Sequence, residues 1–208
     1  MTSGTLGVLG LAFLPTLGNF GGGVLAEWLH PSQKILNRAL HAATGIIISV
    51  IAVEVMPEAL EKASAWLLAL GYVAGGGAYL LLEAGIDRWQ QSKPEGAGAG
   101  AWMVYAAVAT DLLRDGLLIG AGLAFSSQLG LVLALGQVFA DIPEGFAVIV
   151  NFRDKGVKRV KRLLISASFA LPVLGAAAVG FLALRGQSEA VKMAALVAVA
   201  GLYTLAVV

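Results

Sequence analysis

An uncharged run at residues 163–184 reads LLISASFALPVLGAAAVGFLAL. An α-helix rises about 1.5 Å per residue, so a run of this length spans the roughly 30 Å hydrocarbon layer of a bilayer. The run is too long and too continuous for a barrel strand, and a helix satisfies its own backbone hydrogen bonds in lipid. It therefore predicts a membrane-spanning helix. By the same rule the chain contains seven spans, at about residues 4–27, 35–57, 63–86, 101–124, 128–150, 163–184 and 190–208.

The composition supports the same fold class. Of the 208 residues, 58% are hydrophobic and 13% are charged, whereas soluble domains carry about 25% charged residues. So little charge cannot cover a water-soluble surface, and the net charge of +1 excludes a nucleic-acid partner. Cysteine is absent, which excludes disulfides and thiolate metal sites. We expect an all-α, polytopic transmembrane helix bundle that forms one domain over residues 1–208, with the lipid bilayer as its first partner.

Lysine and arginine predict the orientation. Residues 151–162 hold six basic side chains, and such loops stay in the cytoplasm. Counting spans back from this basic loop places residues 87–100 inside as a flexible cytoplasmic loop and the N-terminus outside. The expected location is a bacterial inner (plasma) membrane. The last span is uncharged only over residues 193–208, which is short for a crossing, so an eighth span is expected to be missing from the seven visible ones.

Four acids inside two neighbouring spans carry the functional prediction. Asp111 and Asp115 are four residues apart, and Asp141 and Glu144 are three apart, so each pair shares one helix face. The turn at residues 126–130 is short, which makes the two helices antiparallel neighbours. We therefore expect the four carboxylates to converge at mid-depth. Ionisable side chains within spans face the bundle interior and mark ion or substrate paths.

Four converging carboxylates need compensating charge, from protons, from a bound cation or from Arg114. Oxygen-rich sites suit hard or borderline divalent ions, and zinc also accepts carboxylate oxygens. Glu54 and Gln137 are further candidates for the ion path, together with Arg114. Two alternatives stay open: a non-transporting protein in which Arg114 locks the acids, and an intramembrane aspartyl hydrolase with paired aspartates. Arg114 speaks against the hydrolase because it would hold the acids ionised.

Three short motifs resemble one known family. Residues 141–145 read DIPEG, which resembles the second metal motif of the ZIP (Zrt/Irt-like) transporters, GufA/ZupT-like branch. Residues 111–116 read DLLRDG and resemble a degenerate form of that family's His-Asn-x-Pro-Glu-Gly. Residues 54–59 read EVMPEA and resemble the signature that ends the family's second helix. The resemblance implies eight helices, a binuclear metal site between the fourth and fifth, and transport of divalent metals towards the cytoplasm.

The motif positions differ from the family pattern at several places. Asp111 stands for the motif's His and Asp115 for its Glu, while Asp141 and Glu144 are retained. At three positions where the family has a metal ligand, this chain has Leu112, Ala140 and Leu171 instead. Arg114 stands where the first motif has its proline. We therefore expect one altered metal site instead of two.

The sequence thus predicts a transporter and not an enzyme. Its substrate is a divalent metal ion, with zinc first and cadmium, iron or manganese as alternatives. The predicted metal ligands are Asp111, Asp115, Asp141 and Glu144. A homodimer stays open as the assembly.

Overall fold

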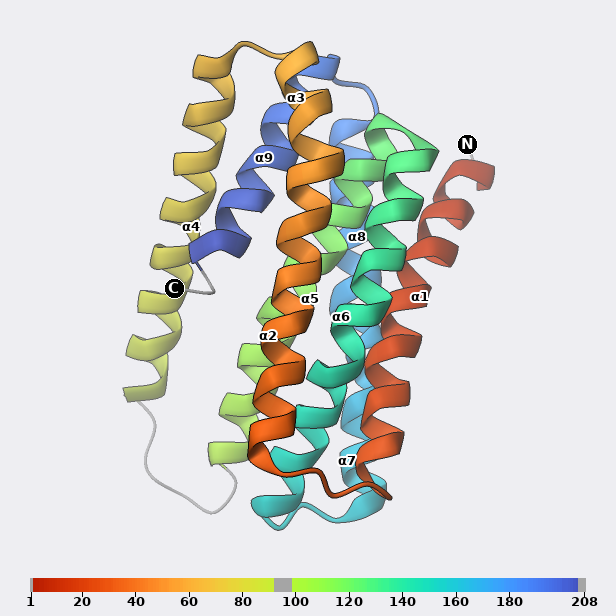
Figure 1. Cartoon of the computed structure of the whole chain (residues 1–208), viewed down its shortest axis with the longest axis vertical. Helices are drawn as coiled ribbons and strands as arrows, with labels where there is room; N and C mark the ends of the chain where they lie inside the picture. The colour runs from red at the N-terminus through yellow and green to blue at the C-terminus, as the bar shows by residue number, and fades with distance from the viewer. Residues whose placement is uncertain (1, 92–98, 206–208) are drawn as a thin grey trace.

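The computed structural model describes residues 2–91 and 99–205, and within these ranges every regular element is helical. The elements form seven rods along one long axis (Figure 1). In chain order they are α1 (Thr2–Ala26), α2 (Gln33–Val50), η1 (Ile51–Val55), α3 (Met56–Lys62), α4 (Ala65–Gln91), α5 (Ala99–Phe125), α6 (Ser127–Asp154), α7 (Arg159–Ser168), α8 (Ala170–Leu184) and α9 (Glu189–Leu205). Elements α2, η1 and α3 form one rod, and α7 and α8 form another.

Each predicted span falls on one of these rods, so the all-α prediction is confirmed. Five rods are long and apolar enough to cross a membrane: Leu6–Ala26, Gln33–Lys62, Ala65–Ile86, Ser127–Asp154 and Arg159–Leu184. The other two predicted spans do not qualify on length and composition. Near its middle α5 carries Asp111, Arg114 and Asp115, and α9 is described over 17 residues.

The two predicted loops are shorter than expected. Helix α4 continues to Gln91 and α5 begins at Ala99, so residues 92–98 of the predicted loop 87–100 lie outside the described residues. Within the predicted basic loop 151–162, α6 runs on to Asp154 and α7 begins at Arg159. The chain reverses between them with Gly156 at φ 73°, a conformation that glycine adopts without strain.

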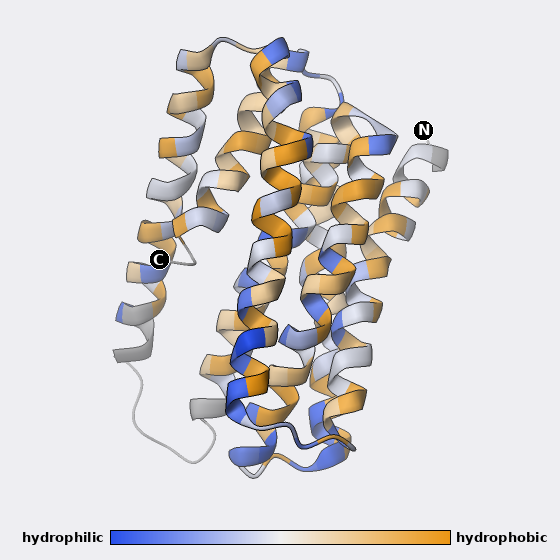
Figure 2. Ribbon diagram, viewed as in Figure 1, coloured by the Kyte–Doolittle hydropathy of each residue, from blue (hydrophilic) through white to orange (hydrophobic). Residues whose placement is uncertain are grey.

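The outer surface of the rods is apolar. Trp66, Leu81 and Leu171 are each more than 70% exposed, and large apolar side chains are exposed on every long helix. Hydrophilic residues gather at the two ends of the bundle and in its interior (Figure 2). A soluble protein does not expose apolar surface on this scale, whereas a bilayer covers it.

The rods fall into three groups by their contacts. Helices α1, α5, α6, α7 and α8 form the first bundle, in which α1 packs on α6 and α5 packs on α8. Helix α4 packs on α9, and these two form the α4–α9 pair. The α2–η1–α3 rod lies between the groups, because α2 contacts α6 while α3 contacts α9. The first bundle and the α4–α9 pair meet where α5 touches α9.

Glycines allow the paired helices to touch backbone to backbone. A Cβ atom on Gly18 or Gly22 of α1 would collide with the carbonyl oxygens of Val138 and Ile142 on α6. The α5–α8 and α4–α9 contacts repeat this spacing of four residues, with Gly116 and Gly120 on α5 and Gly71 and Gly75 on α4. Small residues at this spacing let membrane helices approach closely, which gives the glycine-rich composition a packing role.

One turn of the second rod departs from α geometry. Residues Ile51–Val55 form a π-helical turn, and the backbone N–H of Met56 donates to the carbonyl of Ile51. Pro57 follows directly and has no N–H to donate, so the carbonyl four residues before it lacks its usual partner. The apolar pattern of residues 35–57 predicted a helix there but not this widened turn.

A buried ion pair joins the end of α1 to the start of α7. Arg162 donates to both carboxylate oxygens of Glu27, from Nε at 2.8 Å and from Nη2 at 2.7 Å. The Glu27 side chain is 5% exposed and that of Arg162 is 10% exposed. Arg159 lies 3.6 Å from the same carboxylate. The hydrogen bond from Arg162 lowers the pKa of Glu27 below its ordinary value of 4.5.

Glu27→Gln is expected to lower the melting temperature by about 3 °C or more, because Arg162 is left without its charge partner. The pKa of Glu27 is lowered in the folded protein, so the ion pair contributes fully above about pH 4.5. The contribution is lost as the pH falls through that lowered pKa. Melting curves of the detergent-solubilised proteins should differ most at neutral pH and converge in acid. A constant difference at all pH values would contradict the assignment.

Candidate metal site

The helices that carry the acids form one tight hairpin. Helix α5 ends at Phe125 and α6 begins at Ser127, with Ser126 between them. The Ser126 hydroxyl accepts a hydrogen bond from the backbone N–H of Leu129 at 3.1 Å and so caps the start of α6. This turn fixes the register of the two helices. The predicted antiparallel hairpin is therefore confirmed, and Asp115 comes to the level of Asp141 and Glu144.

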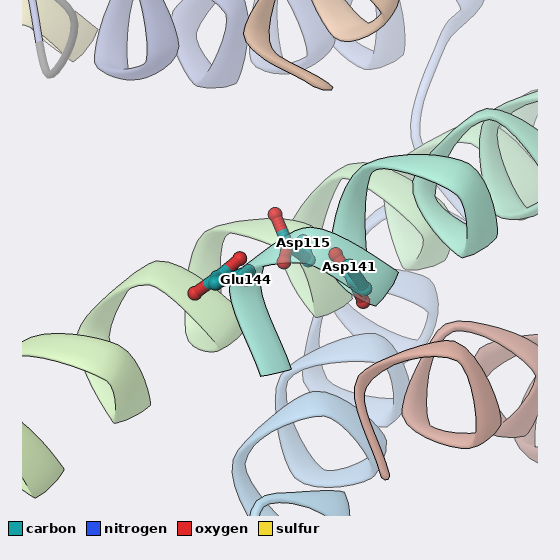
Figure 3. A group of neighbouring side chains, drawn as sticks. All are labelled: Asp115, Asp141 and Glu144. Atoms are coloured by element: carbon teal, nitrogen blue, oxygen red, sulfur yellow. The ribbon is translucent and has the colours of Figure 1, made fainter. Parts of the chain in front are cut away.

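Three of the four predicted carboxylates come together. One oxygen each from Asp115, Asp141 and Glu144 lie within 4.8 Å of one another, and Figure 3 shows the three side chains meeting where α5 and α6 touch. Oxygen ligands of one zinc ion stand about 3.4 Å apart in tetrahedral geometry. The three oxygens therefore lie close enough together to be candidate ligands of one ion. These three residues are called the carboxylate cluster below.

Asp115 and Asp141 of the carboxylate cluster are buried and Glu144 is half-buried, and not all of their oxygens have hydrogen-bond partners. Asp115 is 5% exposed and Asp141 is 2% exposed. Oδ2 of Asp141 and Oε1 of Glu144 are buried and have no hydrogen-bond partner among the described residues. Buried polar atoms in native proteins are normally paired, because an unpaired one loses its hydration without compensation. The two free oxygens therefore point to a group that the protein itself does not supply.

Asp111 does not belong to the carboxylate cluster. Its carboxylate pairs with Nη2 of Arg114 on the same helix, and its side chain is 43% exposed. Asp111 lines the same cavity as Asp115, as expected for residues on one helix face, but its carboxylate is outside the group of three oxygens. The prediction of four converging carboxylates is thus met by three residues and one neighbouring ion pair.

The remaining predicted path residues lie in different places. Gln137 is fully buried one turn from Asp141, while Glu54 is exposed on η1 and does not line the cavity described below. Leu112 and Leu171, where the ZIP resemblance implied lost ligands, both lie away from the carboxylate cluster. Leu112 is packed in the core of the first bundle, and Leu171 is 72% exposed.

A tyrosine from α9 completes the site. The Tyr203 hydroxyl donates a hydrogen bond to Asp115 and accepts one of 2.8 Å from Nε2 of Gln137. Tyr203 was not predicted as a site residue, although it and Thr204 are the two hydroxyl side chains in the apolar span 190–208. That signal was present, but nothing in the sequence fixes the level at which α9 crosses α5.

A cavity of about 580 Å³ leads to the carboxylate cluster. Its walls come from α2, α4, α5 and α6, and the lining residues lie on the halves of these helices nearer the basic loop, from Leu40 and Ile86 to Asn151. It ends beside Ala140 and Tyr203. Beyond that point the apolar side chains of Leu118 and Leu133 are buried and fill the bundle. The described residues thus leave the site open towards the basic-loop end and closed towards the other end.

The glycines beside the acids explain how α5 and α6 can pack tightly within the first bundle and still line the cavity. Consecutive helix residues point about 100° apart. Glu144 lines the cavity, while Gly145 turns away and meets the carbonyl oxygen of Asn19 on α1. Asp115 and Gly116 behave in the same way, with Gly116 against the carbonyl of Val173 on α8. Each Asp/Glu-Gly pair therefore anchors its helix in the first bundle and presents its acid to the cavity.

A scan against protein-family models found no match, and a search of curated proteins found none either.

Proposed function

We propose that this protein is an integral membrane transporter that moves a divalent transition-metal ion through the carboxylate cluster. The observation that carries the proposal is the pair of buried, unpartnered oxygens on Asp141 and Glu144 at the inner end of a cavity. An intramembrane carboxylate is costly unless it meets a compensating charge. The cluster brings up to three negative charges, and a divalent ion compensates two of them.

The ligand chemistry narrows the substrate. The cluster offers carboxylate oxygens, which suit hard or borderline divalent ions. Zinc accepts such ligands and is the first candidate, with cadmium, iron and manganese as alternatives. The short motifs that resemble ZIP transporters, DIPEG above all, support the same substrate class. They also support the direction towards the basic-loop side, which we take as the cytoplasm.

The two-part architecture supports transport over static binding. The first bundle holds the three acids, and the α4–α9 pair reaches them through Tyr203. A bundle that rocks against its neighbour around a mid-depth site gives alternating access. The cavity on one side and the apolar seal on the other correspond to a state open to the basic-loop side.

A non-transporting protein with an arginine lock is the second candidate, and the Arg114–Asp111 pair favours it. In the described residues, however, Arg114 pairs with the acid that stands outside the carboxylate cluster. The lock therefore leaves the three clustered acids uncompensated, which is why we place transport first.

Soaking crystals in cadmium or zinc tests the proposal directly. We expect one anomalous-scattering peak between Asp115, Asp141 and Glu144, and uptake of the ion by proteoliposomes loaded with a fluorescent chelator. Liposomes without protein serve as the control for leakage. No peak at the carboxylate cluster together with uptake at the leakage rate would refute transport. That result would favour the locked protein, whereas a peak without uptake would show a metal site that does not transport.

A further inference from the structure

We propose that Arg114 is a tethered cation that competes with the transported ion for the carboxylate cluster. When no ion is bound, the guanidinium exchanges between the clustered acids and the seat beside Asp111, where the structure shows it; a bound ion keeps it at Asp111. This inference rests on the proposed function and adds a specificity-determining residue to that site.

The structure shows the seat beside Asp111. Nη2 of Arg114 pairs with the Asp111 carboxylate, and the guanidinium carbon lies 5.0 Å from the ring centre of Tyr203 and 5.9 Å from that of Tyr79. A guanidinium within about 6 Å of an aromatic ring centre is attracted to the ring face. The two tyrosines come from α9 and α4, so this seat spans the boundary between α5 and the α4–α9 pair.

The other seat is marked by groups that have no partner. Within residues 2–91 and 99–205, Nε and Nη1 of Arg114 are buried without acceptors, and Oδ2 of Asp141 and Oε1 of Glu144 are buried without donors. All three residues line the same cavity. A rotation of the Arg114 side chain towards Asp141 and Glu144 would pair these donors with these acceptors. Because arginine has a long side chain that presents five N–H groups in a planar fork, it can reach neighbouring carboxylates from either seat.

Two consequences follow for ion binding. The ion must displace a positive charge, so its affinity is lower than the carboxylates alone would give. The site also holds one divalent ion, because the guanidinium and a second ion would repel each other at this spacing. Arg114 thus supplies the second positive charge that a second ion would supply in a binuclear site.

Replacing Arg114 by a neutral residue tests the competition. Arg114→Met keeps the length of the side chain and removes its charge, and we expect cadmium to bind about tenfold or more tightly by isothermal titration calorimetry of the solubilised full chain. Arg114→Lys keeps the charge and should bind close to wild type. Arg185→Met is the matched control, because Arg185 is exposed in the turn between α8 and α9, outside the cavity. Size-exclusion profiles and melting curves show that each variant is folded.

A double-mutant cycle with Asp111 distinguishes competition by Arg114 from a role of Asp111 as an ion ligand. Asp111→Asn removes the seat beside Asp111, leaves Arg114 on the clustered acids and weakens cadmium binding. In the Arg114→Met background the same change should have a clearly smaller effect, since no guanidinium remains to be displaced. An equal loss in both backgrounds would make Asp111 an ion ligand and overturn the proposal.

The outcomes distinguish this inference from the proposed function. If wild type binds cadmium and Arg114→Met binds it no more tightly, the tethered cation is refuted while transport stands. If only Arg114→Met binds, the competition is supported and transport by the wild type fails. If neither protein binds, the proposed function and the tethered cation both fail.

Discussion

Glu144→Gln is expected to weaken cadmium or zinc binding by about a hundredfold or more and to reduce uptake into proteoliposomes to the leakage rate. The amide keeps the size of the side chain but removes one of the three charges that compensate the ion. Glu144 is half-buried with one oxygen fully buried, and loss of such a charged ligand costs about 3 kcal/mol, which corresponds to that factor. Calorimetry measures the affinity, and chelator fluorescence measures the uptake.

Glu83→Gln is the matched control for this experiment. Glu83 lines the same cavity from α4 but stands outside the carboxylate cluster. The change removes the same charge from the same cavity, so it corrects for long-range attraction of cations. Equal losses in Glu83→Gln and Glu144→Gln would mean that the cavity attracts ions without a defined site.

Gly22→Leu is expected to destabilise the protein by at least about 3 kcal/mol, because overpacking at a backbone contact leaves no side chain that can move aside. A Cβ on Gly22 would overlap the carbonyl oxygen of Ile142, which lies between Asp141 and Glu144 in α6. The substitution should therefore separate α1 from α6 and abolish ion binding as well. Thermal unfolding followed by circular dichroism and a cadmium titration measure the two effects.

Gly10→Leu is the control on the same helix. A Cβ on Gly10 meets nothing within 4 Å, so leucine there points outward from α1. The substitution should leave the melting temperature within a few degrees of wild type. A large loss at Gly10, or tolerance at Gly22, would show that the α1–α6 contact is not what holds the first bundle together.

Much of the helical architecture could be predicted because lipid imposes one length and one hydrogen-bonding pattern on every span. Each predicted span falls on a helical rod, and the short turn at Ser126 predicts the hairpin that brings Asp115 to Asp141 and Glu144. The three-residue spacing of Asp141 and Glu144 and the short connection between the two helices were sufficient to predict that these three acids meet.

The rest of the site depends on contacts that spacing does not encode. The period of the helix places Asp111 beside Asp115, but the competing attraction of Arg114 decides where its carboxylate goes. Tyr203 reaches Asp115 because α9 packs against α5 as well as against α4. Such crossings are fixed by packing between distant segments. The π-helical turn at Ile51–Val55 was missed for a related reason, since its apolar pattern is that of an ordinary helix.

The hairpin of α5 and α6 also bears on the order in which the protein is made. All three clustered acids lie between Ala99 and Asp154, in a single stretch of chain that is synthesised before α9. Segments of a growing chain assemble from the N-terminal side. The carboxylates can therefore enter the bilayer as one folded unit, already facing each other, and Tyr203 joins them as the last component from a helix translated afterwards.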